Sequence, residues 1–183
     1  NIKDAAKESG LPVEAVLEKA KQTGITALDF DFKDLADGII TPDEARELMA
    51  HFFIKGCEWV NGAVCGSGDA QHYQNIVLSG IDKDGNDITN EISYLILDTV
   101  EELPIGDFPI AVRLNKKSDP AFVRRVAEVI RFGGGVVAVY NEDIILEALM
   151  KYGYRWEDAV RFANDGCWEV QIPGKTYFMY HPF

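Results

Sequence analysis

The first third of the sequence carries apolar residues at the spacing of a helix face. Over 12–23 these positions recur three and four residues apart, as in Val13, Val16, Leu17 and Ala20. A second helix is predicted over 41–60, because Thr41 and Glu44 match a capping box and Pro42 occupies the first helical position. The chain therefore begins with a mainly helical segment.

From residue 73 onward, short apolar runs alternate with helical patterns. Strands are predicted over 73–81, 108–115 and 133–141, and helices over 88–103, 120–132, 142–153 and 155–165. Strands separated by helices of about 12 residues pair in parallel through right-handed crossovers. We therefore predict a helical lead-in over 1–62 and an α/β segment over 63–183.

Composition and charge narrow the classes of function. Of the 183 residues, 47% are hydrophobic and 26% are charged, which is typical of a globular protein. The net charge of -12 repels nucleic acids and anionic membranes, so neither is predicted as a partner. The chain has no apolar run of about 18 residues, and its start resembles no secretory signal, so we expect a cytoplasmic protein. Because it starts at Asn1 rather than methionine, we interpret it as a piece of a longer protein.

Cysteine and histidine are sparse and widely spaced. Neither residue type shows a CxxC pair or the spacing of metal ligands, which disfavours disulfides and a structural zinc site. The residues concerned are Cys57, Cys65, Cys167, His51, His72 and His181.

Three motifs have simpler interpretations than ligand binding. The turn 82–87 matches the start of a calcium loop, but Asp87 and Ser93 replace its essential glycine and glutamate, so we predict a turn in which Asp87 caps the next helix. The glycines of 133–135 are interpreted as a helix cap rather than a phosphate loop. The solvent-exposed face of the helix predicted over 120–132 is expected to carry Arg124, Arg125 and Arg131.

The candidate chemistry lies in the sequence Gly-Cys-Trp-Glu. Cys167 and Glu169 point the same way if the backbone there is extended, because side chains alternate along a strand. A neighbouring carboxylate disfavours a thiolate, so this pair suits chemistry that needs a neutral S–H group. A buried structural role for Cys167 stays open. So does a cysteine hydrolase, in which His72 or His51 lies within about 3.2 Å of a sulfur such as that of Cys65.

The stretch 152–169, which ends in Gly-Cys-Trp-Glu, resembles the Gly-Cys-Val-Glu loop of the glycyl radical enzymes of the pyruvate formate-lyase-like family. Further stretches at 73–98, 109–115 and 128–149 resemble the same family and follow its order. The similarity covers about 40–175.

This resemblance implies a fold and a site. The fold is a ten-stranded α/β barrel of the pyruvate formate-lyase type, of which this chain would form about one half-barrel. Cys167 matches the cysteine that carries a thiyl radical, and Glu169 matches the carboxylate that accepts a proton from a substrate hydroxyl. The resemblance also implies a glycyl radical, installed by an activating enzyme that uses S-adenosylmethionine and an iron–sulfur cluster.

The sequence departs from the family's pattern at two places, and these differences shape our expectations. Trp168 and Val170 stand where valine and proline are common in the family, and the motif Arg-Val-x-Gly of the radical glycine is absent. We therefore expect the radical glycine outside this chain, no bound cofactor or metal within it, and an isolated fragment without activity.

The interpretation that we favour is a fragment of a glycyl radical dehydratase or carbon–heteroatom lyase. A decarboxylase, a formate acetyltransferase-like member or a non-catalytic binding or spare-part protein are the alternatives. The expected partners are a small-molecule substrate, the activating enzyme, the remainder of the same polypeptide and a second copy in a homodimer.

Overall fold

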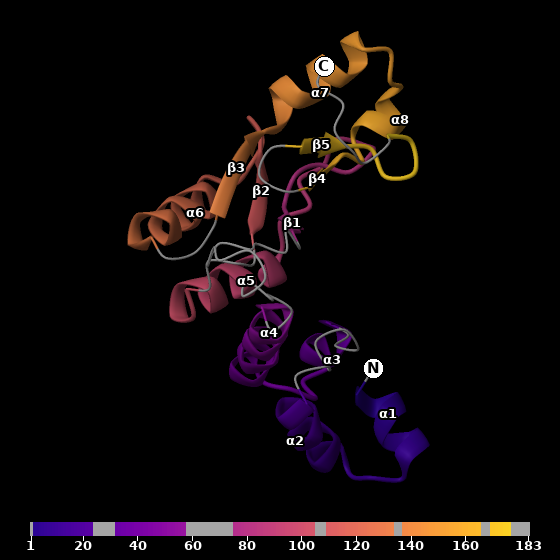
Figure 1. Ribbon diagram of the computed structural model, residues 1–183, viewed down its shortest axis with the longest axis vertical. Helices are drawn as coiled ribbons and strands as arrows, with labels where there is room; N and C mark the ends of the chain where they lie inside the picture. Colours follow the sequence, from indigo (N-terminus) through magenta and orange to yellow (C-terminus); the bar gives the residue numbers. More distant parts are fainter. Residues whose placement is uncertain are drawn as a thin grey trace, which may run out of the picture.

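The computed structural model describes residues 2–23, 32–57, 75–104, 109–133, 137–165 and 169–176. In the view of Figure 1 the molecule is elongated: helices α1 to α4 lie at one end, a parallel sheet lies in the middle, and α7, α8 and the hairpin β4–β5 lie at the other end.

Among the described residues, four helices precede the sheet. Their bounds are Ile2–Ser9 for α1, Val13–Thr23 for α2, Phe32–Ala36 for α3 and Pro42–Cys57 for α4. The predicted capping box of α4 is confirmed, since the Glu44 N–H donates to Thr41 Oγ1 at 3.2 Å and the Thr41 N–H donates to Glu44 Oε2 at 2.9 Å. The predicted boundary at residue 62 lies outside the described residues and stays a prediction.

The sheet has three parallel strands in the order β1-β2-β3, with bounds Ile76–Leu78, Ile110–Leu114 and Val137–Asn141. Helix α5 (Glu91–Glu102) connects the first two strands and α6 (Pro120–Phe132) connects the second and third. The predicted parallel α/β arrangement is therefore confirmed.

The two faces of this sheet differ in chemistry. Leu78, Ile110 and Val112 belong to the main apolar core together with residues of α4, α5 and α6. Because side chains alternate along a strand, Asn75 and Arg113 face the opposite side, where the hairpin β4–β5 lies (Figure 1). One face of the sheet thus holds the helices and the other holds a polar site.

The helix caps correct one prediction and confirm another. Asn90, not Asp87, is the N-cap of α5, and its side chain accepts hydrogen bonds from the N–H groups of Ile92 and Ser93. The Asp87 carboxylate instead accepts from Thr89, because Asp87 lies three residues before the N-cap. Gly133 ends α6 with a φ of 67°, as its predicted cap role requires.

The turn 82–87 is closed by its own first side chain. The Asp82 carboxylate accepts the N–H groups of Asp84 and Asn86, both at 2.9 Å, and the side-chain amide of Asn86 at 3.1 Å. These bonds, led by that from the Asn86 backbone, hold the pKa of Asp82 below its ordinary value.

The prediction of a fully solvated arginine face on α6 is wrong for Arg125. Its guanidinium binds Asp98 at 2.7 Å and also binds Glu101, so it joins α6 to α5. Arg124 and Arg131 are exposed as predicted.

The predicted helix over 155–165 is also wrong. Helix α7 (Glu142–Lys151) is followed by a single turn, α8 (Trp156–Ala159), and then by a hairpin of β4 (Ala163–Asp165) and β5 (Glu169–Gln171). The carbonyls of Val160 and Phe162, which a continuing helix would need as acceptors, bind the side chain of Arg113 instead. Contacts with the sheet therefore override the local helical pattern.

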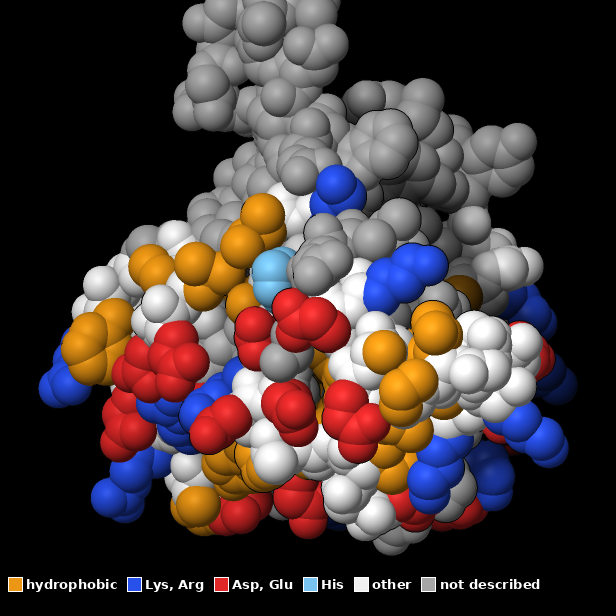
Figure 2. Space-filling view, turned by 90° about the horizontal axis from the view of Figure 1, so that it is seen from below, with side chains coloured by type: hydrophobic (Ala, Val, Ile, Leu, Met, Phe, Trp, Pro, Cys, Tyr) orange, Lys and Arg blue, Asp and Glu red, His pale blue; other side chains and the backbone are white. Residues whose placement is uncertain are grey.

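No helix among the described residues is long and apolar enough to cross a membrane. On the face of the molecule shown in Figure 2, acidic side chains are interspersed with basic and apolar ones.

Candidate functional site

The carboxyl ends of the three parallel strands meet at a buried ion pair. Arg113 comes from the end of β2 and Glu142 from the first residue of α7, directly after β3. Ser79, directly after β1, donates its hydroxyl to the Arg113 carbonyl. Because parallel strands end at one edge of a sheet, residues 79, 113 and 142 converge there despite their separation in sequence.

The Glu142 carboxylate is fully buried, and the described residues around it supply its partners. It accepts hydrogen bonds from the Ile81 N–H at 3.2 Å, from the Asn115 side chain and from Arg113. Burial lowers the pKa of the Arg113 guanidinium, and the negative charge of Glu142 opposes that shift. The guanidinium remains charged, since arginine is not deprotonated in proteins.

Gly80 lies against this ion pair and has no room for a side chain. A Cβ atom there would lie 2.8 Å from Arg113 Nε and 2.9 Å from Glu142 Oε1. Its φ of +105° is also one that residues with a side chain rarely adopt. The turn after β1 thus closes the site on one side.

Arg113 also binds the segment that leads into the hairpin. Its two terminal nitrogens donate to the carbonyls of Phe162 at 3.1 Å and Val160 at 2.9 Å, and its guanidinium carbon lies 4.0 Å from the centre of the Phe162 ring. Asn75 donates its side-chain amide to the Asn164 carbonyl at 3.2 Å. Side chains of the sheet therefore hold β4 and its approach.

The hairpin pairs Asp165 with Glu169 and Asn164 with Val170. Three residues, 166–168, connect the paired ends, and they include Cys167. Ile172 and Phe162 anchor the hairpin in a second apolar core formed with α7 and α8. The hairpin is thus fixed on both strands.

The candidate residues from the sequence are only partly described. Glu169 is the first residue of β5 and is exposed, whereas Cys167 lies outside the described residues. Of the alternative cysteine–histidine pair, Cys65 and His72 also lie outside, and His51 is on α4.

Sequence reasoning missed Arg113, Glu142 and Asn75. A signal existed for the first two residues: Arg113 interrupts an apolar strand, and Glu142 begins a helix directly after a strand. Charged residues in buried strands are rare unless they are paired. For Asn75 the chain offers no comparable signal.

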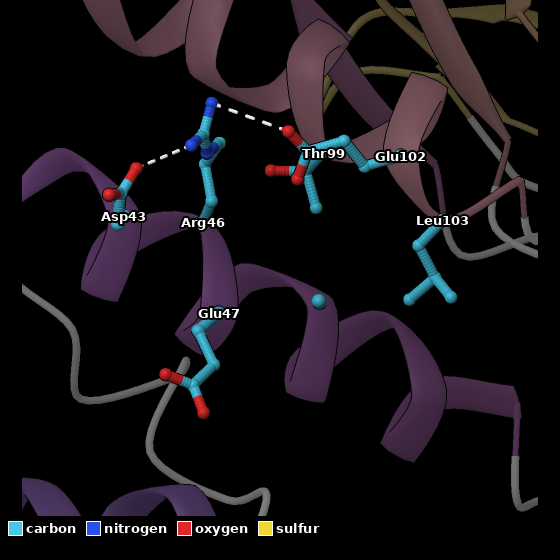
Figure 3. Close-up of a pocket in the computed structure, with 7 residues that line it drawn as sticks. Asp43, Arg46, Glu47, Thr99, Glu102 and Leu103 are labelled. Carbon is cyan, nitrogen blue, oxygen red and sulfur yellow. Dashed lines mark hydrogen bonds and ion pairs between the residues drawn. The ribbon is translucent and has the colours of Figure 1, made fainter.

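A separate cleft lies between α4 and α5 (Figure 3) and has a volume of about 340 Å³. Arg46 spans it and binds Asp43 and, at 3.4 Å, Glu102. Its lining contains no thiol or imidazole: Asp43, Arg46, Glu47, Ala50, Thr99, Glu102 and Leu103. The two ion pairs of Arg46 lie in this cleft, and none of the candidate residues from the sequence is among the described residues that line it.

The fold and site define an α/β protein, in which a polar site at the ends of parallel strands holds a hairpin over the sheet. The sequence model of the family described as "Pyruvate formate lyase-like" matches residues 30–182. The chain belongs to this family, and its sheet and crossover helices are part of that family's α/β barrel.

Relatives that the chain resembles include lyases, dehydratases and a decarboxylase. The chain is 28% identical over 151 residues to isethionate sulfite-lyase of Oleidesulfovibrio alaskensis, covering 80% of this chain and 18% of that protein. It is 32% identical over 152 residues to trans-4-hydroxy-L-proline dehydratase of Clostridioides difficile, covering 80% and 19%. The chain thus spans about a fifth of the length of these relatives.

Solved structures show the same fold. The glycerol-bound form of the B12-independent glycerol dehydratase from Clostridium butyricum matches with a TM-score of 0.67 and 33% identity, over 75% of this chain and 18% of that chain.

Proposed function

We propose that this chain is the cysteine-loop segment of a glycyl radical dehydratase or carbon–heteroatom lyase. The observation that carries this proposal is the hairpin that brackets Gly166-Cys167-Trp168, held against a parallel sheet in a family of dehydratases and lyases. The proposed catalytic residues are Cys167 and Glu169.

The proposed reaction begins with hydrogen-atom transfer. Cys167 gives its thiol hydrogen to the radical glycine, which we place in the remainder of the polypeptide, and the resulting thiyl removes a hydrogen atom from a substrate carbon. S–H and activated C–H bonds are similar in strength, so this transfer is nearly balanced. The substrate radical then holds the unpaired electron, and the cysteine is again a thiol.

Glu169 acts in the next step of the proposal. Its carboxylate accepts the proton of the substrate hydroxyl next to the radical carbon, and the leaving group departs with its bonding electrons. The product radical recovers a hydrogen atom from Cys167, which regenerates the thiyl. Glu169 suits this role because it lies two residues from Cys167, at the start of a strand.

The proposal includes partners that this chain alone does not supply. An activating enzyme with S-adenosylmethionine and an iron–sulfur cluster would install the radical, and the full-length enzyme would form a homodimer in the cytoplasm. A reducing compartment suits an enzyme whose cysteine must stay a free thiol.

The decisive test replaces Cys167 in the full-length enzyme. We expect Cys167→Ser to abolish turnover, because hydrogen-atom abstraction needs sulfur, while the glycyl radical is still installed. Turnover is measured by product formation and the radical by electron paramagnetic resonance. Cys57→Ser is the matched control and should keep turnover. Measurable turnover by Cys167→Ser would contradict the proposal.

The type of reaction is tested at Glu169. We expect Glu169→Gln to lose product formation by on the order of 10²-fold, the usual loss when a general base is removed. It should still exchange substrate hydrogen with the thiyl, which deuterium-labelled substrate and mass spectrometry reveal. Unchanged product formation would instead favour a decarboxylation or a carbon–carbon cleavage, in which the carboxylate only positions the substrate.

A further inference from the structure

Three carbonyl groups lead toward the cysteine loop, and each accepts a hydrogen bond from a side chain of the sheet or its approach. The carbonyls belong to Val160, Phe162 and Asn164, and their donors are Arg113 for the first two and Asn75 for the third. Val160 ends the helical turn α8 and Asn164 lies in β4, so this segment is held from the end of the helix into the strand.

The two donors lie at opposite ends of the sheet but on the same face. Asn75 precedes β1, and Arg113 lies near the end of β2. Ile76 pairs with Ile110 in the parallel register, so alternation places both donors on the face away from the main core. The segment therefore runs across the sheet and is bound at two separated points.

Arg113 is itself held rigidly. Glu142 binds its guanidinium, the Phe162 ring stacks against it at 4.0 Å, and Gly80 closes the space beside its Nε atom. Its side chain is 7% exposed, and that of Glu142 is 0% exposed. In such a buried setting a hydrogen bond to a charged donor is stronger than one in water.

We infer that Arg113 and Asn75 are positioning residues that set the location of the cysteine loop relative to the sheet. Asn164 is only three residues from Cys167, so a shift of β4 moves the sulfur with it. This inference rests on the proposed function, because it matters only if Cys167 exchanges a hydrogen atom with a second residue. A misplacement of about 1 Å costs on the order of 10²-fold in rate when reacting atoms must meet.

The variants are chosen to keep charge and fold. Arg113→Lys keeps the positive charge beside Glu142 but loses the planar fork that reaches two carbonyls. Asn75→Ala removes the amide that donates to the Asn164 carbonyl, at a position that is only half-buried. Arg125→Lys is the matched control, since Arg125 binds Asp98 and Glu101 between α5 and α6.

One measurement follows the cysteine–glycine step without substrate. A glycyl radical carries one hydrogen on its α carbon, which splits its paramagnetic resonance signal into a doublet. In deuterated water the thiol of Cys167 becomes S–D, and repeated transfer puts deuterium on that carbon and collapses the doublet. The rate of collapse therefore reports hydrogen transfer between the two residues.

In the full-length activated enzyme we expect Arg113→Lys to lower both kcat and the collapse rate by on the order of 10²-fold. Asn75→Ala should lower both rates by about 10-fold, because it loses one of the three bonds. Radical yield and KM should stay at their wild-type values, which a purely structural role would not predict. The rates are compared at a temperature at which circular dichroism shows each variant to be folded, because the loss of buried hydrogen bonds lowers the melting temperature. Arg125→Lys should leave both rates unchanged.

Wild-type values of kcat and collapse rate in both variants overturn the inference, provided that Cys167→Ser is inactive. If Cys167→Ser itself keeps turnover or collapse, the proposed function fails instead, so the two failures are distinct. If Arg113→Lys does not fold, Asn75→Ala decides by the same two rates.

Discussion

Gly80 occupies a position in the site that a residue with a side chain does not fit. Its backbone has a positive φ, and the space where a Cβ would lie is filled by Arg113 and Glu142. The ion pair and the glycine are therefore mutually dependent: the pair is buried because Gly80 lets the turn after β1 approach it closely.

We predict that Gly80→Ala lowers the free energy of unfolding by about 2 to 4 kcal/mol, as overpacking and backbone strain add. Gly38→Ala is the control, since Gly38 has a similar positive φ of +69° with no atom within 4 Å of the added Cβ. Its loss should be about 1 to 2 kcal/mol, from the backbone alone. Urea unfolding followed by circular dichroism measures the free energy of unfolding of both variants. Equal losses would contradict the prediction, because they would show that Arg113 and Glu142 move aside for the added methyl group without cost.

At the scale of elements, α5 and α6 are joined by charge as well as by the core. The hydrogen bond from Arg125 holds the pKa of Glu101 below its ordinary value, and the same bond raises the pKa of Arg125. A carboxylate whose pKa is lowered on folding stabilises the protein above its unfolded pKa, and this stabilisation is lost as pH falls through the folded pKa. The contact between these helices is therefore sensitive to acid.

We predict that Glu101→Gln reduces the free energy of unfolding at neutral pH but not once the pH falls well below 4.5, the ordinary glutamate pKa. Urea unfolding of both proteins across this range measures the difference. In an Arg125→Gln background the same substitution should show little dependence on pH, because the partner of the carboxylate is gone. A difference that stays constant with pH would refute this assignment.

At the scale of the whole molecule, the site at the hairpin contains a buried amide whose hydrogen bonds the described residues do not supply. Asn164 is 5% exposed, yet neither of its side-chain amide atoms has a hydrogen-bond partner among the described residues. Buried amides are nearly always paired in complete proteins. Since the chain spans about a fifth of its relatives, groups beyond the described residues are expected to complete this site.

We predict that these 183 residues alone carry out no radical chemistry, even with the activating enzyme, S-adenosylmethionine and strict exclusion of oxygen. The reason is that no glycine of this chain lies in the Arg-Val-x-Gly motif. Electron paramagnetic resonance after attempted activation is the test, with the full-length enzyme as positive control. A glycyl doublet from the isolated chain would show that the chain holds its own radical glycine.

The sequence by itself determined the α/β architecture and its parallel pairing. Apolar strands and amphipathic helices alternate at the lengths of crossover connections, and the predicted capping residue Thr41 begins a helix where a local hydrogen bond is available. The Gly-Cys-x-Glu sequence also identified the family, because its residues are adjacent in the chain. Such features depend on neighbours in sequence, so the sequence is sufficient to find them.

Only the tertiary structure decided where the polar groups meet. The polar residues that meet there are up to 67 residues apart in the sequence, and no local pattern links them: Asn75, Arg113 and Glu142. The same contacts accompany the change of 163–165 from a predicted helix into a strand: Asn75 binds the Asn164 carbonyl, and Arg113 binds the carbonyls of Val160 and Phe162 just before β4. Local propensity amounts to less than about 1 kcal/mol per residue, whereas a hydrogen bond to a buried charge contributes about 1.5 to 3 kcal/mol, so the long-range contacts prevail.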